Sequence, residues 1–157
     1  MNPLDELYQA VILDHSRRPR NFTSQPSPPA FHAEGVNPSC GDEIEVWVSF
    51  GPDGKIDKVT FKGQGCAISQ SAASIMTVKA AGRTVEEARG LITGFHNIVS
   101  TELDPDMDKF GEMAVFAGVR QFPQRVKCAM LGWRALEQAL NKEAGAPNRI
   151  STEGDRD

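Results

Sequence analysis

Apolar and polar residues alternate along two neighbouring stretches of the chain. In Glu43–Phe50 the apolar residues fall on every second position, which is the period of a half-buried β-strand. The turn-rich sequence GPDGK follows, and Ile56, Val59 and Phe61 then supply the apolar positions of a returning strand. The two segments predict a β-hairpin, and the short stretch Ala30–Val36 is expected to add a third strand beside it.

Other segments have apolar residues at helical spacing. Asn2 as N-cap and Pro3 as first helical position predict a helix at the start of the chain. A second helix is expected from Cys66 to near Gly82, and a short third one over Thr84–Leu91, which opens with a capping-box pattern. The last helix is predicted to begin at Pro123. Its buried stripe comprises Ala129, Trp133, Leu136 and Leu140.

Prolines and glycines interrupt two further segments. Ser16–Ala30 contains four prolines, which remove backbone donors and predict an extended connector. Residues 92–121 contain a proline and three glycines, so one or two short helices in a loop-rich stretch are expected. The chain from Asn141 is polar, and the tail over about 142–157 is predicted to fray.

The order of these elements predicts an α+β fold. A helix, then strands, then helices fits a small three-stranded antiparallel sheet with helices packed on one face. The length of 157 residues is that of a single domain, so residues 1–157 are expected to form one unit.

Composition narrows the class of protein. Seventeen Lys and Arg against 21 Asp and Glu give a formal charge of −4, which disfavours nucleic acid as a partner. The start of the chain lacks the pattern of a signal peptide, and no stretch reaches the roughly 18 apolar residues of a membrane span. Three cysteines cannot form a closed disulfide framework. The expected location is therefore cytoplasmic, without membrane association and with reduced thiols.

Each cysteine lies in a context that favours a thiolate or a metal ligand. Cys40 is in the loop sequence NPSCGDE, where Asp42 can face the same ion. Cys66 follows two glycines at a predicted helix N-terminus, where unpaired N–H groups should lower its pKa. Cys128 is expected in the second turn of the last helix, one turn after Arg125.

The wide spacing of the cysteines excludes the local knuckle of a zinc finger, so a shared site requires the fold to bring them together. Three thiolates and one carboxylate suit zinc or iron, with Arg125 and Lys127 as candidate compensating cations. The alternative is that the three cysteines are separate packing residues, because free cysteine is often buried. His15, His32 and His96 are far from the cysteines in sequence and are expected to be structural or exposed.

Several motifs occur together in the order of a known family. NPSCGDE, FKGQGCAISQSAASIM and FPQRVKCAMLGWRALEQAL follow LYQAVILDHSRRPRN, and together they resemble the SufU branch of the IscU/NifU-like iron-sulfur cluster assembly proteins. The resemblance implies that Cys40, Asp42, Cys66 and Cys128 are metal ligands. It also implies that Cys40 accepts persulfide sulfur from a SufS-type cysteine desulfurase and that downstream iron-sulfur assembly proteins are further partners.

Two departures from the housekeeping scaffolds of that family bear on the function. Lys127 stands where those scaffolds have a histidine, and FPQRVK replaces their chaperone motif. The extended stretch over about 84–121 is similar to the insertion of SufU-like members. The sequence therefore favours a zinc-dependent sulfur acceptor, with Cys40 as the reactive residue. A scaffold for a [2Fe–2S] cluster on the same ligands and a cysteine hydrolase using Cys66 stay open as alternatives.

Overall fold

The computed structural model describes residues 3–23, 30–100, 107–141 and 149–151. Asn2, predicted as the first N-cap, lies outside these ranges. The chain order begins with α1 (Pro3–Arg17), β1 (Phe31–Asn37), β2 (Asp42–Phe50) and β3 (Ile56–Gln64). It continues with α2 (Ala67–Ala80), α3 (Val85–Ser100), α4 (Met107–Phe110), the 3-10 helix η1 (Gly111–Gln121), α5 (Pro123–Leu140) and β4 (Arg149–Ser151).

The three predicted strands form an antiparallel meander, which confirms the predicted hairpin and the third strand. β1 pairs with β2 and β2 with β3, and the sheet order is β3-β2-β1-β4. The fourth strand was not predicted: Arg149–Ser151 lies parallel to β1, within the tail that was expected to fray. The backbone of β1 would otherwise be an unpaired sheet edge, and pairing with β4 satisfies it over Glu34–Val36.

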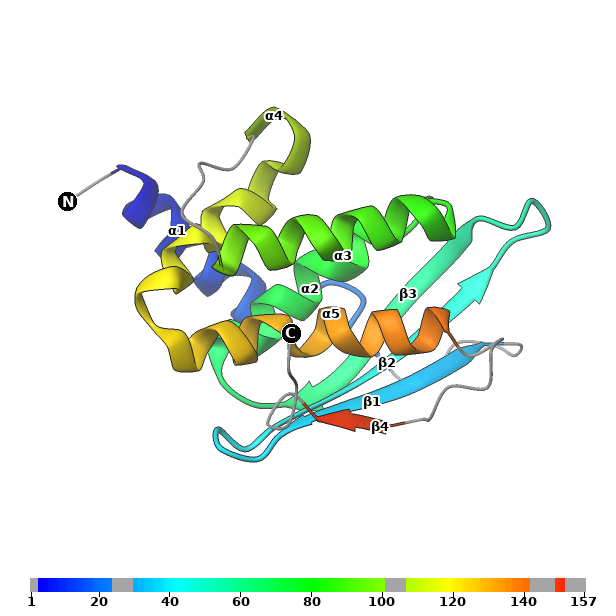
Figure 1. The fold of residues 1–157 in the computed structure, drawn as a ribbon, viewed down its shortest axis with the longest axis horizontal. Helices are drawn as coiled ribbons and strands as arrows, with labels where there is room; N and C mark the ends of the chain where they lie inside the picture. Colours follow the sequence, from blue (N-terminus) through cyan, green and yellow to red (C-terminus); the bar gives the residue numbers. More distant parts are fainter. Residues whose placement is uncertain (1–2, 24–29, 101–106, 142–148, 152–157) are drawn as a thin grey trace.

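The helices cover one face of the sheet, and α5 runs along that face (Figure 1). Alternation along the strands places Ile44, Val46 and Val48 in the core beneath the helices. Trp133 of α5 is fully buried and stacks on Phe95 of α3 with ring centroids 4.8 Å apart. The α+β architecture with helices on one face agrees with the sequence prediction.

The region from 84 to 121 is more helical than predicted. The capping box is present, because the Thr84 N–H donates to Glu87 Oε1 and the Glu87 N–H donates to Thr84 Oγ1. The helix does not end near Leu91, however, but continues to Ser100. Gly94 lies inside it, where a Cβ would stand 2.6 Å from the Phe110 ring. Glycine costs about 1 kcal/mol in a helix, which burial of the apolar stripe that continues beyond Leu91 outweighs.

No helix among the described residues combines the length and the apolar character needed to cross a membrane.

Candidate metal centre

Three chain segments meet at the end of the sheet where the β1–β2 loop lies (Figure 1). They are that loop, the junction between β3 and α2, and the first turns of α5. Each segment carries one cysteine. The fold therefore brings together residues that are widely separated in the sequence.

Cys40 lies in the tight loop that joins β1 to β2. Its backbone N–H donates to the Asn37 carbonyl at 3.2 Å, and the Gly41 N–H donates to the Pro38 carbonyl at 3.4 Å. Gly41 has a φ of +72°, a conformation that closes the loop readily because glycine has no Cβ. Cys40 is half-buried at this loop.

Asp42 begins β2 and is 1% exposed. Its Oδ1 accepts a hydrogen bond from the Cys66 backbone N–H at 2.8 Å, and its Oδ2 lies 3.8 Å from Cys66 Sγ. Gly65 permits this approach, because its φ is +154° and a Cβ there would overlap the Asp42 carboxylate. One carboxylate oxygen is therefore fixed by the backbone, and the other lies beside a thiol.

Cys66 is the N-cap residue of α2 and is half-buried. A hydrogen bond with the Cys128 thiol lowers the pKa of Cys66 to about 6, and hydrogen bonds from Ser69 act in the same direction against the effect of burial. The predicted lowering of this pKa is confirmed in direction. Its largest cause is the partner thiol rather than the helix N-terminus.

Cys128 is fully buried in the second turn of α5. Its Sγ lies 3.3 Å from Cys40 Sγ, and it accepts a hydrogen bond from Asn37 Nδ2 at 3.6 Å. The hydrogen bond with Cys66 raises the pKa of Cys128, and burial raises it further. For the thiols alone, the pKa of Cys66 is lowered as expected, whereas the pKa of Cys128 is raised, because the two thiols share a proton through their hydrogen bond.

Arg125 is the cation that the fold places beside the thiols. The Cys66 thiolate raises the pKa of its guanidinium, and Cys128 contributes in the same direction. One surface hollow beside Arg125 contains Cys66 and a second contains Cys40. Lys127 is exposed, and within the described residues it has no recorded hydrogen bond or ion pair with the cysteines.

Donor atoms from three of the four predicted ligands lie close together. Those of Cys40, Asp42 and Cys128 all lie within 4.8 Å of one another, and Cys66 joins them through its contacts with Asp42 and Cys128. Zinc–ligand distances of about 2.0 to 2.3 Å place ligand atoms about 3.3 to 3.8 Å apart in a tetrahedron. The 3.8 Å between Cys66 Sγ and Asp42 Oδ2 is near that spacing, whereas the 3.3 Å between Cys40 Sγ and Cys128 Sγ is shorter than the roughly 3.8 Å expected of two sulfurs on one zinc ion. Cys40, Asp42 and Cys128 could therefore hold a metal ion together, and Cys66 lies beside Asp42.

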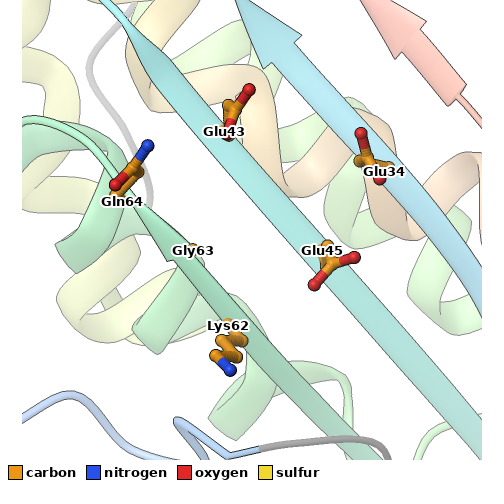
Figure 2. Close-up of a pocket in the computed structure, with 6 residues that line it drawn as sticks. All are labelled: Glu34, Glu43, Glu45, Lys62, Gly63 and Gln64. Carbon is orange, nitrogen blue, oxygen red and sulfur yellow. The ribbon is translucent and has the colours of Figure 1, made fainter.

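A third hollow lies on the sheet face that points away from the helices (Figure 2). It is lined by Glu34, Glu43, Glu45, Lys62, Gly63 and Gln64. Successive side chains of β2 point to opposite faces of the sheet. Asp42 is therefore buried on the helix side, and its neighbour Glu43 faces outward. This hollow contains no thiol.

The histidines of the described region do not contact the cysteine cluster. His15 is buried, with Nδ1 2.7 Å from Ser74 Oγ and Nε2 3.3 Å from Glu112 Oε1. His32 stacks on Trp47 at 5.0 Å. A hydrolase that used Cys66 would need a general base within hydrogen-bond reach, and no described histidine is placed to serve as one.

Sequence reasoning missed three residues that shape the site. Gly65 admits the Asp42 carboxylate, Ser69 hydrogen-bonds with Cys66, and the Asn37 amide contacts Cys128. The two glycines of the GQG sequence before Cys66 are a sequence signal for a close approach of another group to the backbone. No spacing rule pointed to Asn37.

Comparison with known proteins agrees with the geometry. The NifU-like N terminal domain family matches residues 7–148. The chain is 39% identical to the iron-sulfur cluster assembly scaffold protein IscU of Streptococcus pyogenes serotype M1, over 93% of this chain and 90% of that protein. It is 35% identical to the zinc-dependent sulfurtransferase SufU of Bacillus subtilis strain 168, over 90% of this chain and 95% of that protein.

A solved structure has the same fold. It is that of a candidate iron-sulfur cluster assembly scaffold protein for the SUF system from Fervidobacterium islandicum AW-1. It aligns with a TM-score of 0.76 and 34% identity, covering 86% of this chain and 97% of the other. The resemblance drawn from the sequence motifs is thereby confirmed, and the chain belongs to the NifU-like N-terminal domain family of iron-sulfur cluster assembly proteins.

Proposed function

We propose that this protein is a zinc-dependent sulfur acceptor, which takes persulfide sulfur from a SufS-type cysteine desulfurase and passes it to downstream iron-sulfur assembly proteins. The observation that carries the proposal is the convergence of three thiols and one carboxylate on a half-exposed surface of the domain. The SufU relative, named as a zinc-dependent sulfurtransferase, supports it. Reduced thiols are needed for such a reaction, which is consistent with a cytoplasmic location.

In this proposal Cys40, Asp42, Cys66 and Cys128 hold the zinc ion. When bound, zinc acts as a Lewis acid that keeps the coordinating thiols deprotonated at neutral pH. Asp42 is held for this role by the hydrogen bond from the Cys66 backbone. Arg125 offsets part of the negative charge that the donor set gathers.

Cys40 is the proposed sulfur acceptor. Its thiolate attacks the outer sulfur of the desulfurase persulfide, and a new S–S bond forms on Cys40 while the S–S bond of the donor breaks. The donor cysteine leaves as a thiolate, and Cys40 carries the persulfide. No external oxidant or reductant is needed, because the sulfur moves between two equivalent cysteines.

Position distinguishes Cys40 from the other two cysteines. Cys128 is fully buried in α5, and the backbone of Cys66 is bound to the Asp42 carboxylate. Cys40 and Cys66 each line a surface hollow beside Arg125, but Cys40 lies in a short loop rather than at a helix start that is held by a carboxylate. The hollow at Cys40 leaves room for a partner cysteine to approach Cys40.

A scaffold role is the second candidate. The Streptococcus relative, at 39% identity, is named as a scaffold protein, and thiolates bind iron-sulfur clusters as well as zinc. Metal analysis of the purified protein, followed by anaerobic reconstitution monitored by visible absorption, separates the two functions. Stoichiometric zinc with no stable cluster supports the sulfur acceptor, whereas a stable [2Fe–2S] spectrum supports the scaffold.

The acceptor role is tested with the desulfurase. Sulfide release in the presence of a thiol reductant is measured with the native protein, with Cys40→Ser and with Ser39→Ala. Ser39 is an exposed neighbour on the same loop and serves as the matched control. We expect the native protein and Ser39→Ala to stimulate the desulfurase and Cys40→Ser to have no effect. Stimulation by Cys40→Ser would refute the role of Cys40.

A further inference from the structure

Asn37 connects the loop of Cys40 to the helix of Cys128. It is the last residue of β1, stands opposite Asp42 in the sheet register, and is 1% exposed. Its backbone carbonyl accepts the Cys40 N–H at 3.2 Å, and its side-chain Nδ2 donates to Cys128 Sγ at 3.6 Å. A single buried residue therefore contacts the segments of three of the four proposed ligands.

The hydrogen bond to Cys128 Sγ sets the orientation of the Asn37 amide. Within the described part of the chain, Asn37 Oδ1 is buried and has no hydrogen-bond partner. A buried, unpaired carbonyl oxygen is unfavourable, so the amide oxygen of Asn37 does not stabilise the folded state. The recorded side-chain hydrogen bond is the one from Nδ2 to Cys128.

The strength of this bond varies with the charge on Cys128. A neutral thiol is a weak acceptor, whereas a hydrogen bond to an ionised acceptor is about twice as strong as a neutral one. A coordinating thiol is deprotonated outright, so an Nδ2 donor is worth more in the metal-bound protein. Hydrogen bonds to ligands from neighbouring groups typically contribute about 10- to 100-fold in metal affinity.

We infer that Asn37 is a positioning residue of the metal centre, whose amide N–H orients Cys128 Sγ and stabilises its thiolate toward the ion. The inference rests on the proposed zinc site but not on the identity of the sulfur donor. It assigns to the asparagine of NPSC a role separate from that of the ligands themselves.

The test is the affinity for zinc, measured by competition with a chromophoric chelator. Asn37→Leu keeps the approximate volume and removes both the N–H and the unpaired oxygen. Asn37→Asp keeps the shape and replaces the donor with a negatively charged acceptor. Thr60→Val is the matched control, because Thr60 also carries a buried oxygen without a partner among the described residues and lies in the middle of β3, opposite Trp47.

We expect Asn37→Leu to lower the zinc affinity about 10-fold or more and Asn37→Asp to lower it further. Because Asn37→Leu removes an unpaired oxygen, the metal-free protein should unfold at the native temperature or above it. Thr60→Val should leave the zinc affinity unchanged. In the cobalt-substituted protein, the sulfur-to-cobalt charge-transfer band should move to lower energy in both Asn37 variants, since a hydrogen bond to sulfur is lost.

Native zinc affinity and an unmoved cobalt band in Asn37→Asp would overturn the inference, whether or not Asn37→Leu folds. A fall in zinc affinity that merely follows an equal loss of stability in the metal-free protein would also overturn it, because it would indicate a structural role alone. Failure of the native protein to bind zinc or cobalt would instead refute the proposed metal centre. The failures of the two proposals are therefore distinguishable.

Discussion

The Sγ atoms of Cys40 and Cys128 lie 3.3 Å apart, although one belongs to a hairpin loop and the other to the interior of a helix. This contact is shorter than the 3.8 Å between Cys66 Sγ and Asp42 Oδ2. Cys40 and Cys128 therefore form a close sulfur pair, and Cys66 contacts both the Asp42 carboxylate and the Cys128 thiol.

The close pair predicts which disulfide forms when the metal is removed. Treatment of the chelated protein with hydrogen peroxide should join Cys40 to Cys128, with loss of two hydrogens from the thiols and reduction of the peroxide to water. Peptide mapping by mass spectrometry without reductant identifies the pair. The same product is expected in Cys66→Ser. Preferential coupling of Cys66 in the native protein would contradict the observed geometry.

The shared proton predicts the pH dependence of Cys66. Because its pKa is lowered to about 6, Cys66 in the chelated protein should react with iodoacetamide at pH 7 much faster than Cys128. Its rate should fall about tenfold per pH unit below that pKa.

Cys128→Ala tests the cause of this low pKa. The substitution removes the largest favourable contribution to the Cys66 thiolate, so the midpoint of the alkylation profile should move to higher pH. Ser71→Ala, on the same helix as Cys66, serves as the control and should retain the native midpoint. A midpoint that stays near 6 in Cys128→Ala would disprove the hydrogen-bond explanation.

The approach of Asp42 to the backbone predicts a strict requirement for glycine at position 65. In Gly65→Ala the Cβ would overlap the Asp42 carboxylate and lie 2.8 Å from Ser69 Oγ, so we expect a loss of about 1 to 3 kcal/mol in unfolding free energy and of zinc binding. Gly90→Ala is the control, because Gly90 is exposed in α3 with open space around its Cα. It should be neutral or stabilising by up to about 1 kcal/mol. Equal unfolding temperatures and zinc contents for both variants would refute this reading.

Metal removal should lower the thermal stability of the native protein. Free zinc at about 100 times its dissociation constant stabilises the folded state by about 2.7 kcal/mol, or about 5 to 10 °C in a domain of this size. Differential scanning calorimetry before and after chelation measures the change. Cys128→Ala, which lacks one proposed ligand, should show a much smaller shift. An unchanged melting temperature in the native protein would argue against a zinc contribution to folding.

Periodicity predicted the elements but not their close contacts. The alternation in β2 and the stripe of α5 were sufficient for the sheet and the last helix. Gly94 wrongly indicated the end of a helix. A glycine is present inside α3 because the Phe110 ring of α4 packs where a Cβ would otherwise stand. Arg149–Ser151 has no strand pattern of its own and is a strand because β1 offers it a free edge.

The candidate site was also predicted only in part, because the sequence identified its residues but not their contacts. The sequence motifs singled out Cys40, Asp42, Cys66 and Cys128, yet the distances between these residues depend on how three elements pack. Which thiol keeps the proton follows from burial and hydrogen bonding, and these exist only in the folded chain. The contribution of Asn37 depends on one side-chain contact across the fold, which leaves no mark on the sequence pattern.

The most direct measurement of the central claim is the location of the transferred sulfur. The zinc-loaded protein is incubated with a cysteine desulfurase and cysteine, trapped with an alkylating reagent, digested and analysed by mass spectrometry. We predict one additional sulfur atom on the peptide that contains Cys40 and none on those that contain Cys66 and Cys128. Sulfur on Cys66 or Cys128, or on no cysteine of this chain, would contradict the proposal that Cys40 is the acceptor.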